Sequence, residues 1–362
     1  MRHLIKLFIS VIFIVLLSDC QKKEKTTTRK MVDSTGFATE SYQMDSINKR
    51  IARCQFPLLD SLKKQDKINS WKTVITPHDD YSYVGYLYPA ALSKINTKHV
   101  ILIGVAHKAR QFSLENKIVF GHFDSWLAPY GEVKVSKFQE RLISYLHPET
   151  YIIHQDMMKT EHSLEAIIPF IQQNNPSVQI LPVLVPYMSF DQLTKNALDF
   201  SKTLHKIMEQ YKLEWGKDIS IVISSDAVHY GDKDWGGKNF AKFGADSSGY
   251  KKALQHEKEL IDSYLTGNIK QEKIKGFYYS TVKKENYKKY KWTWCGRYSI
   301  PFGLLTSMYL TEYSEGDSLT GVFIDYSTSI ANKPIPVKDI LMGHTAPANI
   351  RHWVGYTAVG YH

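Results

Sequence analysis

The sequence predicts an α/β fold with a mixed, largely parallel central sheet that is flanked by helices. Short runs of β-branched residues alternate along the chain with longer segments whose apolar residues repeat at helical spacing. The strand candidates are almost uniformly apolar, which is typical of strands buried on both faces. No linker rich in Pro or Gly divides residues 46–362, so we expect a single domain there.

Composition is that of a globular protein. The chain has 362 residues, of which 43% are hydrophobic and 23% charged, and this is enough to bury a large core. The formal net charge of +10 comes from basic residues spread along the whole sequence. Charge alone therefore indicates no particular partner.

The N-terminal stretch MRHLIKLFISVIFIVLLSDC has the features of an export signal. A basic start precedes an apolar run from Leu7 to Leu17, which is shorter than the about 20 residues that a membrane-spanning helix needs. The stretch resembles a bacterial lipoprotein signal, so we expect residues 1–19 to be a signal peptide and Cys20 to be the lipidated first residue of the mature protein. The chain would then be exported and anchored in a membrane, on the periplasmic side or the cell surface. An uncleaved N-terminal anchor is the alternative.

The segment after Cys20 is rich in Lys, Thr and Ser. Such a composition buries too little apolar surface to offset the entropy of ordering, so residues 20–45 are predicted to be a disordered tether. The following helical pattern places Cys54 on its apolar face. An exported protein could also pair Cys54 with Cys295 in a disulfide, and both possibilities stay open.

Six apolar runs are the strand candidates, and two helical patterns between them begin at Leu164 and Phe190. The strand candidates are residues 73–77, 99–105, 179–186, 218–225, 321–327 and 354–361.

Three of these strands end in polar residues of the same kind. His78 follows the first, His107 the second, and Asp226 and His229 follow the fourth. Ligands of open α/β sheets bind beyond the carboxyl ends of the strands. The three histidines are therefore predicted to converge on one polar site.

The same segments resemble known motifs. PHDDYSYVG, IGVAHK, TEHSLEAIIPF, LPVLV, SSDAVHYG and WCGRYSIPFGLL resemble, in order, motifs of the Memo family, also called AmmeMemoRadiSam system protein B. They span residues 77–305, and a YTAVG ending is also similar. The resemblance implies a fold related to class III extradiol dioxygenases.

The resemblance further implies a metal site. Its ligands would be His78, His107 and Cys295, with Asp226 and His229 beside them as catalytic residues. Two imidazoles and a thiolate suit a transition metal, with iron or copper favoured and zinc as the other choice. The sequence departs from the family pattern at Asp79–Asp80 and at Lys108, where the family has small residues and often a second histidine.

Three more residues are candidates for binding the substrate. Glu161 and His162 precede Ser163, which we expect to cap a helix. Arg297 follows Cys295 by two residues, and it could also lower the pKa of the thiol.

Two functions are consistent with these residues. The first is a metal-dependent oxidoreductase, similar to dioxygenases, that acts on a small molecule. The alternative is a binding module without turnover that uses the same crevice for a peptide, a small ligand or a metal. The lysines and aromatic residues of 278–292 could suggest nucleic-acid binding, but export argues against it, and we interpret this stretch as an exposed helix face.

Overall fold

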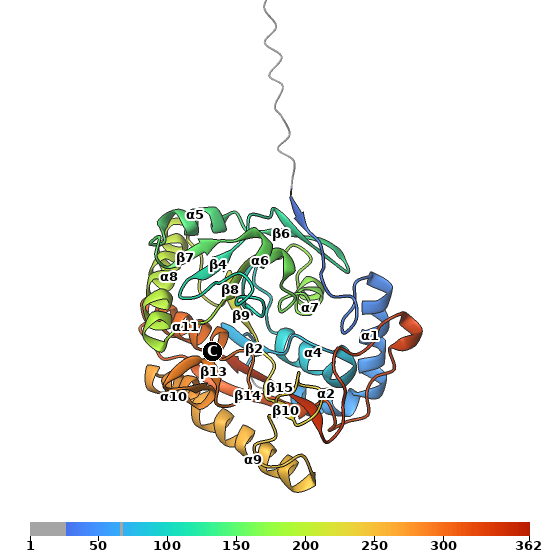
Figure 1. Cartoon of the computed structure of the whole chain (residues 1–362). Helices are drawn as coiled ribbons and strands as arrows, with labels where there is room; N and C mark the ends of the chain where they lie inside the picture. Colours follow the sequence, from blue (N-terminus) through green and yellow to red (C-terminus); the bar gives the residue numbers. More distant parts are fainter. Residues whose placement is uncertain (1–26, 66–67) are drawn as a thin grey trace, which may run out of the picture.

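The computed structural model describes residues 27–65 and 68–362 (Figure 1). The predicted signal peptide and Cys20 lie outside this range. Within it, no helix combines the length and the apolar character that crossing a membrane requires.

A mixed sheet of thirteen strands runs through the described residues, in the order β1-β5-β6-β8-β3-β9-β2-β15-β14-β11 with β4, β7 and β10 attached at its sides. The strands of this sheet are β1 (Thr28–Arg29), β2 (Thr73–Thr76), β3 (His99–Val105), β4 (Ile118–Phe120), β5 (Ser125–Ala128), β6 (Gly131–Val135), β7 (Tyr151–Ile153), β8 (Gln179–Val185), β9 (Ile219–Ser224), β10 (His229–Gly231), β11 (Gly267–Asn268), β14 (Thr320–Thr328) and β15 (His352–Tyr361). Strands β6, β8, β3, β9 and β2 run parallel, and β15 closes onto β2 antiparallel. The predicted fold class and all six strand candidates are confirmed.

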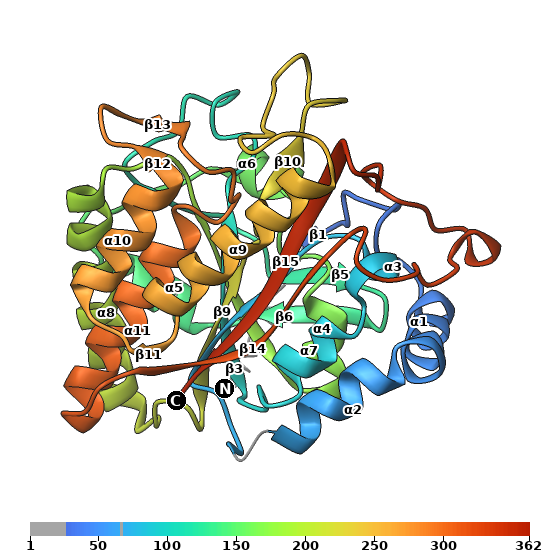
Figure 2. The same cartoon turned by 90° about the horizontal axis from the view of Figure 1, so that it is seen from below.

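Helices cover the sheet on both faces, as Figure 2 shows with the sheet seen nearly edge-on. One layer contains α5 (Phe138–Tyr145), α8 (Phe190–Tyr211), α9 (Ser247–Tyr264), α10 (Gln271–Thr281) and α11 (Ser299–Glu315). The other contains α1 (Ser41–Cys54), α2 (Phe56–Gln65), α3 (Tyr81–Val84), α4 (Leu87–Leu92) and α7 (Ile168–Asn174), while α6 (Gln155–Thr160) lies near the carboxyl ends of the strands. Each layer contributes its own core of buried side chains. Every residue of β2, β3 and β9 is buried, as expected for strands that are covered on both faces.

The register of the parallel strands determines where the site lies. Thr76 of β2 pairs with Ser224 of β9, and Ile103 of β3 pairs with Ile223 of the same strand. These three strands therefore end at one level, and the residues that follow each of them lie together at that edge.

The N-terminal segment is ordered over a longer stretch than the predicted tether allows. Within residues 27–45, β1 pairs with β5, Phe37 is fully buried, and α1 begins at Ser41. The sequence suggested disorder because this segment has few aliphatic residues. Its polar groups are instead bonded to the domain, most clearly through the buried side chain of Arg29.

Three local predictions are wrong. Cys54 is exposed at the end of α1, and Cys54 and Cys295 are both free, so they form no disulfide. Ser163 caps no helix, because α7 begins at Ile168 and the Ser163 hydroxyl donates to the carbonyl of Val105. The lysine-rich stretch is a helix only as far as Thr281.

After Thr281, the lysine-rich stretch forms a separate two-stranded hairpin of β12 (Val282–Lys283) and β13 (Asn286–Tyr290). Lysines are exposed on a hairpin as readily as on a helix face. Composition alone therefore could not distinguish a hairpin from a helix here.

Candidate metal centre

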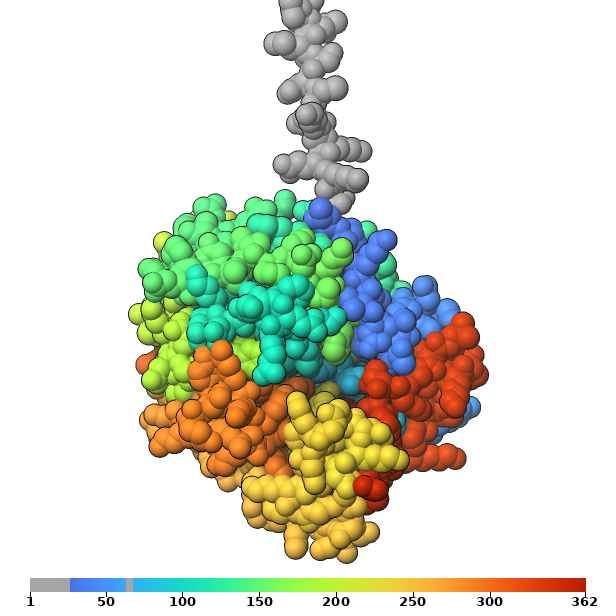
Figure 3. Space-filling view, in the orientation of Figure 1, coloured from blue at the N-terminus to red at the C-terminus, as the bar shows by residue number. Residues whose placement is uncertain are grey.

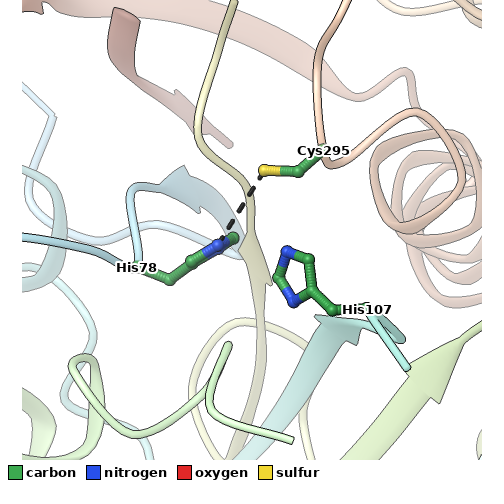
Figure 4. A group of neighbouring side chains, drawn as sticks. All are labelled: His78, His107 and Cys295. Atoms are coloured by element: carbon green, nitrogen blue, oxygen red, sulfur yellow. Dashed lines mark hydrogen bonds between the residues drawn. The ribbon is translucent and has the colours of Figure 1, made fainter. Parts of the chain in front are cut away.

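Three segments deliver His78, His107 and Cys295 to one place at the carboxyl edge of the sheet (Figure 4). His78 follows β2, His107 follows β3, and Cys295 comes from the loop before α11. One ligand atom of each lies within 4.8 Å of the others. His78 and Cys295 are buried, whereas the His107 side chain is 31% exposed and forms the open side of the group.

The hydrogen bonds of His78 define which ring nitrogen carries the proton. The Ser224 hydroxyl donates to the carbonyl of Ser163, so its oxygen is left to accept from His78 Nδ1 at 2.7 Å. His78 Nε2 then carries the lone pair, and it lies 3.8 Å from Cys295 Sγ. Burial, followed by the nearby charge of His107, holds the pKa of His78 well below its usual value, so the ring is neutral and able to coordinate.

His107 is oriented in a similar way by Glu161. Its Nδ1 lies 2.8 Å from Glu161 Oε1, and its backbone N–H donates to Oε2 at 2.7 Å. Burial alone would lower the pKa of His107, but the carboxylate raises it overall. Burial alone would raise the pKa of Glu161. The nearby His107 outweighs this effect and lowers that pKa to about 2. A carboxylate bonded to the Nδ1 proton leaves Nε2 for a metal, as in many metal-binding histidines.

Cys295 is enclosed by the loop that carries Asp226. The Asp226 backbone N–H donates to Cys295 Sγ at 3.2 Å, and the Sγ lies 3.4 Å from the Asp226 carbonyl oxygen. The next residue, Gly296, leaves no room for a side chain, because a Cβ there would lie 2.1 Å from Ser225 Oγ. Burial and the Asp226 carboxyl raise the pKa of the thiol well above its usual value.

Asp226 and His229 lie beside the predicted ligands. Their side chains form a second group with Cys295 in which the ligand atoms are again within 4.8 Å. Asp226 Oδ1 accepts from the His78 backbone N–H at 3.0 Å, while Oδ2 is buried without a hydrogen-bond partner and lies 3.6 Å from His78 Nε2. His229 Nε2 is also buried without a partner.

The three residues predicted to bind the substrate, Glu161, His162 and Arg297, have different surroundings. Glu161 is buried, and its carboxylate is used by His107 and by the Ser163 backbone N–H, so it holds a ligand rather than facing the open side. His162 stacks on His107 with ring centroids 4.8 Å apart and is 30% exposed. Arg297 lies over the ring of Tyr290 at 3.6 Å. The expectation that Arg297 lowers the pKa of Cys295 is wrong, since that pKa is raised.

Asp79 and Asp80, which stand where the family pattern has small residues, bond to Thr345. Asp80 accepts from the Thr345 backbone N–H at 2.9 Å, and Asp79 accepts from the Thr345 hydroxyl at 2.9 Å. They attach the loop around Thr345 to the start of α3.

The sequence did not indicate two supporting residues. Ser224 sets the tautomer of His78. Glu257 of α9 is fully buried and accepts from the indole N–H groups of Trp292 and Trp294 and from the Val228 backbone N–H, at 2.5, 2.7 and 3.2 Å. It thereby joins the loop of Cys295 to the loop of Asp226. Only the serine lies in a quoted motif, and neither residue type alone indicates such a role.

The donor set fits a transition metal. Each of the two imidazoles has a hydrogen-bond partner at Nδ1, which leaves Nε2 for a metal, and a thiol lies within reach of both. The unpartnered Asp226 Oδ2 is a further polar atom that a bound ion or water would satisfy. The fold and these side chains define a mixed α/β protein with a candidate metal centre at the carboxyl ends of its parallel strands.

Comparisons with known proteins identify the family. A model of Memo-like proteins matches residues 40–334, so the chain belongs to the Memo family. A MEMO1 family protein of Pyrococcus furiosus is 26% identical over 166 residues, covering 44% of this chain and 52% of that protein. One from Thermotoga maritima is 26% identical over 200 residues, covering 54% and 65% respectively. The chain thus matches about half to two thirds of the length of these relatives.

Proposed function

We propose that the protein is a metal-dependent oxidoreductase that acts on a small molecule, with His78, His107 and Cys295 as the ligands of one iron or copper ion. The observation that carries the proposal is the convergence of these three side chains with both imidazoles presenting Nε2. A bound transition metal would supply Lewis acidity, redox capacity and an open coordination position.

The remaining side chains would bind and move protons. Asp226 Oδ2 and His229 Nε2 have no hydrogen-bond partner, which supports a role for each in exchanging a proton with a substrate group. Glu161 keeps the His107 ring in orientation. His162 extends the open side of the centre next to His107, where it could contact a substrate.

Turnover can be tested separately from metal binding. We expect the metal-loaded protein to consume dioxygen with ascorbate or a small phenol as the reductant, and the metal-free protein to be inactive. Asp226→Asn should keep its metal but lose about 100-fold in rate, as is typical when a proton-transfer group is removed. Metal binding without consumption of dioxygen by the wild type would favour the alternative, a binding module without turnover.

We also propose that the mature protein is exported and held at a membrane by a lipid on Cys20. The apolar run before this cysteine supports the proposal. Cys20→Ala should abolish labelling with a radioactive fatty acid and release the protein from the membrane fraction, whereas Cys54→Ala should leave both unchanged. Undiminished labelling of Cys20→Ala would rule out this anchor.

A further inference from the structure

Arg297 is a buried cation without a carboxylate partner. The residue is only 5% exposed, its Nε is buried with no hydrogen-bond partner, and no described carboxylate forms an ion pair with it. The ionisable groups that most affect the pKa of its guanidinium are Tyr290 and Tyr298. Buried charges in proteins are almost always paired, so an unpaired one beside a candidate active site indicates that its counterion is a ligand.

Aromatic rings hold this guanidinium in place. Its central carbon lies 3.6 Å from the ring centroid of Tyr290, 4.7 Å from that of Tyr298 and 5.6 Å from that of Tyr187. Stacked rings shield the face of a guanidinium and leave the N–H groups at its edge available. Because the group is already ordered, binding an anion there would cost little additional side-chain entropy.

The guanidinium adjoins the metal centre. Arg297 follows Cys295 by two residues, and the Cys295 sulfur lies within 4.8 Å of a ring nitrogen of His107. Tyr187, which flanks the guanidinium, stacks edge-on against Tyr298 with ring centroids 5.6 Å apart. A small molecule held by Arg297 would therefore reach the open side of the centre at His107.

The surface around this point is basic. The hairpin of β12 and β13 exposes four lysines and one glutamate; the lysines are Lys283, Lys284, Lys288 and Lys289. Figure 3 shows the hairpin in orange, on the same face as the teal segment that follows β3. One of these lysines, Lys288, bonds to Glu115, and the others add to a field that attracts anions.

We propose that Arg297 binds a carboxylate group of the substrate, so that the substrate is a small carboxylic acid whose reacting part faces His107. One planar cation matches one planar monoanion, which it can bind through two parallel N–H···O bonds. This inference rests on the proposed function, because it assumes that the crevice beside the metal centre receives the substrate.

Benzoate and its neutral analogue benzamide test the proposal on the wild-type protein. Two charge-assisted hydrogen bonds are worth enough to predict that benzoate binds at least about 10-fold more tightly than benzamide. Inorganic phosphate should bind more weakly than benzoate. Equal affinity for benzoate and benzamide, no saturable binding of benzoate, or tighter binding of phosphate would each overturn the assignment.

Variants locate the binding site. Arg297→Gln should lose the preference for benzoate, and Arg297→Lys should retain part of it, because lysine keeps the charge but not the planar fork. The control is Arg351→Gln, which removes a guanidinium that is 54% exposed and already paired with Asp232. A preference for benzoate that persists in Arg297→Gln would place the anion elsewhere, for example on the metal.

Metal content measured on the same samples separates this inference from the function on which it rests. Binding of benzoate and benzamide is measured with and without metal. If the wild type holds no metal, the proposed function fails. The preference for benzoate over benzamide can still be measured on the metal-free protein, so the carboxylate assignment is tested independently. If metal is held and the preference is absent, only the carboxylate assignment fails.

Discussion

At the candidate metal centre, each imidazole is oriented by a neighbour at its Nδ1 atom. Ser224 accepts from His78, and Glu161 from His107. The sequence could predict the histidines, because each follows an apolar strand. It could not predict these partners, because a serine within a strand and a glutamate between two strands reach their histidines only through the three-dimensional fold.

Glu161 provides a test at this scale. In Glu161→Gln, the amide NH₂ would face either the His107 backbone N–H or its Nδ1 proton, so His107 would lose one of its two bonds to residue 161. We expect metal affinity to fall about 10–100-fold, measured by competition with a chelator. The control is Glu149→Gln, at a carboxylate that is 66% exposed and paired with Lys195. Unchanged affinity in Glu161→Gln would show that the carboxylate does not position His107.

At the scale of elements, strands were easier to predict than the N-terminal segment. Each strand candidate is an apolar run, and the structure confirms all six. The segment before α1 is polar, yet it packs along the surface between the green segments and the red segment of Figure 3. Its contacts include the pairing of β1 with β5 and side-chain bonds to residues distant in the sequence, and composition carries no signal for such contacts.

Arg29 shows how closely this segment is tied to the site. Its guanidinium is buried, bonds to the Glu165 carboxylate at 2.5 Å, and donates to the carbonyls of Met158 and Glu161. It also lies 4.0 Å from the ring centroid of Trp126. Arg29 thus fixes the backbone of the residue whose carboxylate holds His107.

We therefore expect Arg29→Ala to lower the free energy of unfolding by about 3–5 kcal/mol, because Glu165 would keep a buried charge without a partner. Urea denaturation measures this change. Arg351→Ala removes an exposed arginine and should have a much smaller effect. Similar losses in the two variants would mean that the N-terminal segment contributes little to the fold.

At the scale of the whole molecule, stability should depend on pH through buried histidines. His99 lies at the start of β3, with its ring centroid 4.5 Å from that of Phe138. Burial, assisted by Lys98, lowers the pKa of His99 to about 4. An unfolded histidine has a pKa of about 6.5, so between pH 6.5 and 4 the unfolded chain binds more protons than the folded one.

His99 therefore makes the protein less stable as the pH falls from 6.5 to 4. In His99→Gln, the free energy of unfolding should change less steeply over this interval than in the wild type. The slope is the measured quantity, because the substitution also changes packing by an amount that is independent of pH. Parallel curves for the two proteins would contradict the assigned burial effect.

For the molecule as a whole, the central prediction is that His78, His107 and Cys295 together bind one transition metal. Elemental analysis of purified protein after dialysis against a weak chelator tests it most directly. We predict about one iron or copper ion per chain in the wild type and in Cys54→Ala, whose cysteine is exposed and belongs to none of the candidate ligand groups. Single alanine variants of the three ligands should each lose most of the metal. A wild type without bound metal, or full occupancy in Cys295→Ala, would contradict the proposed centre.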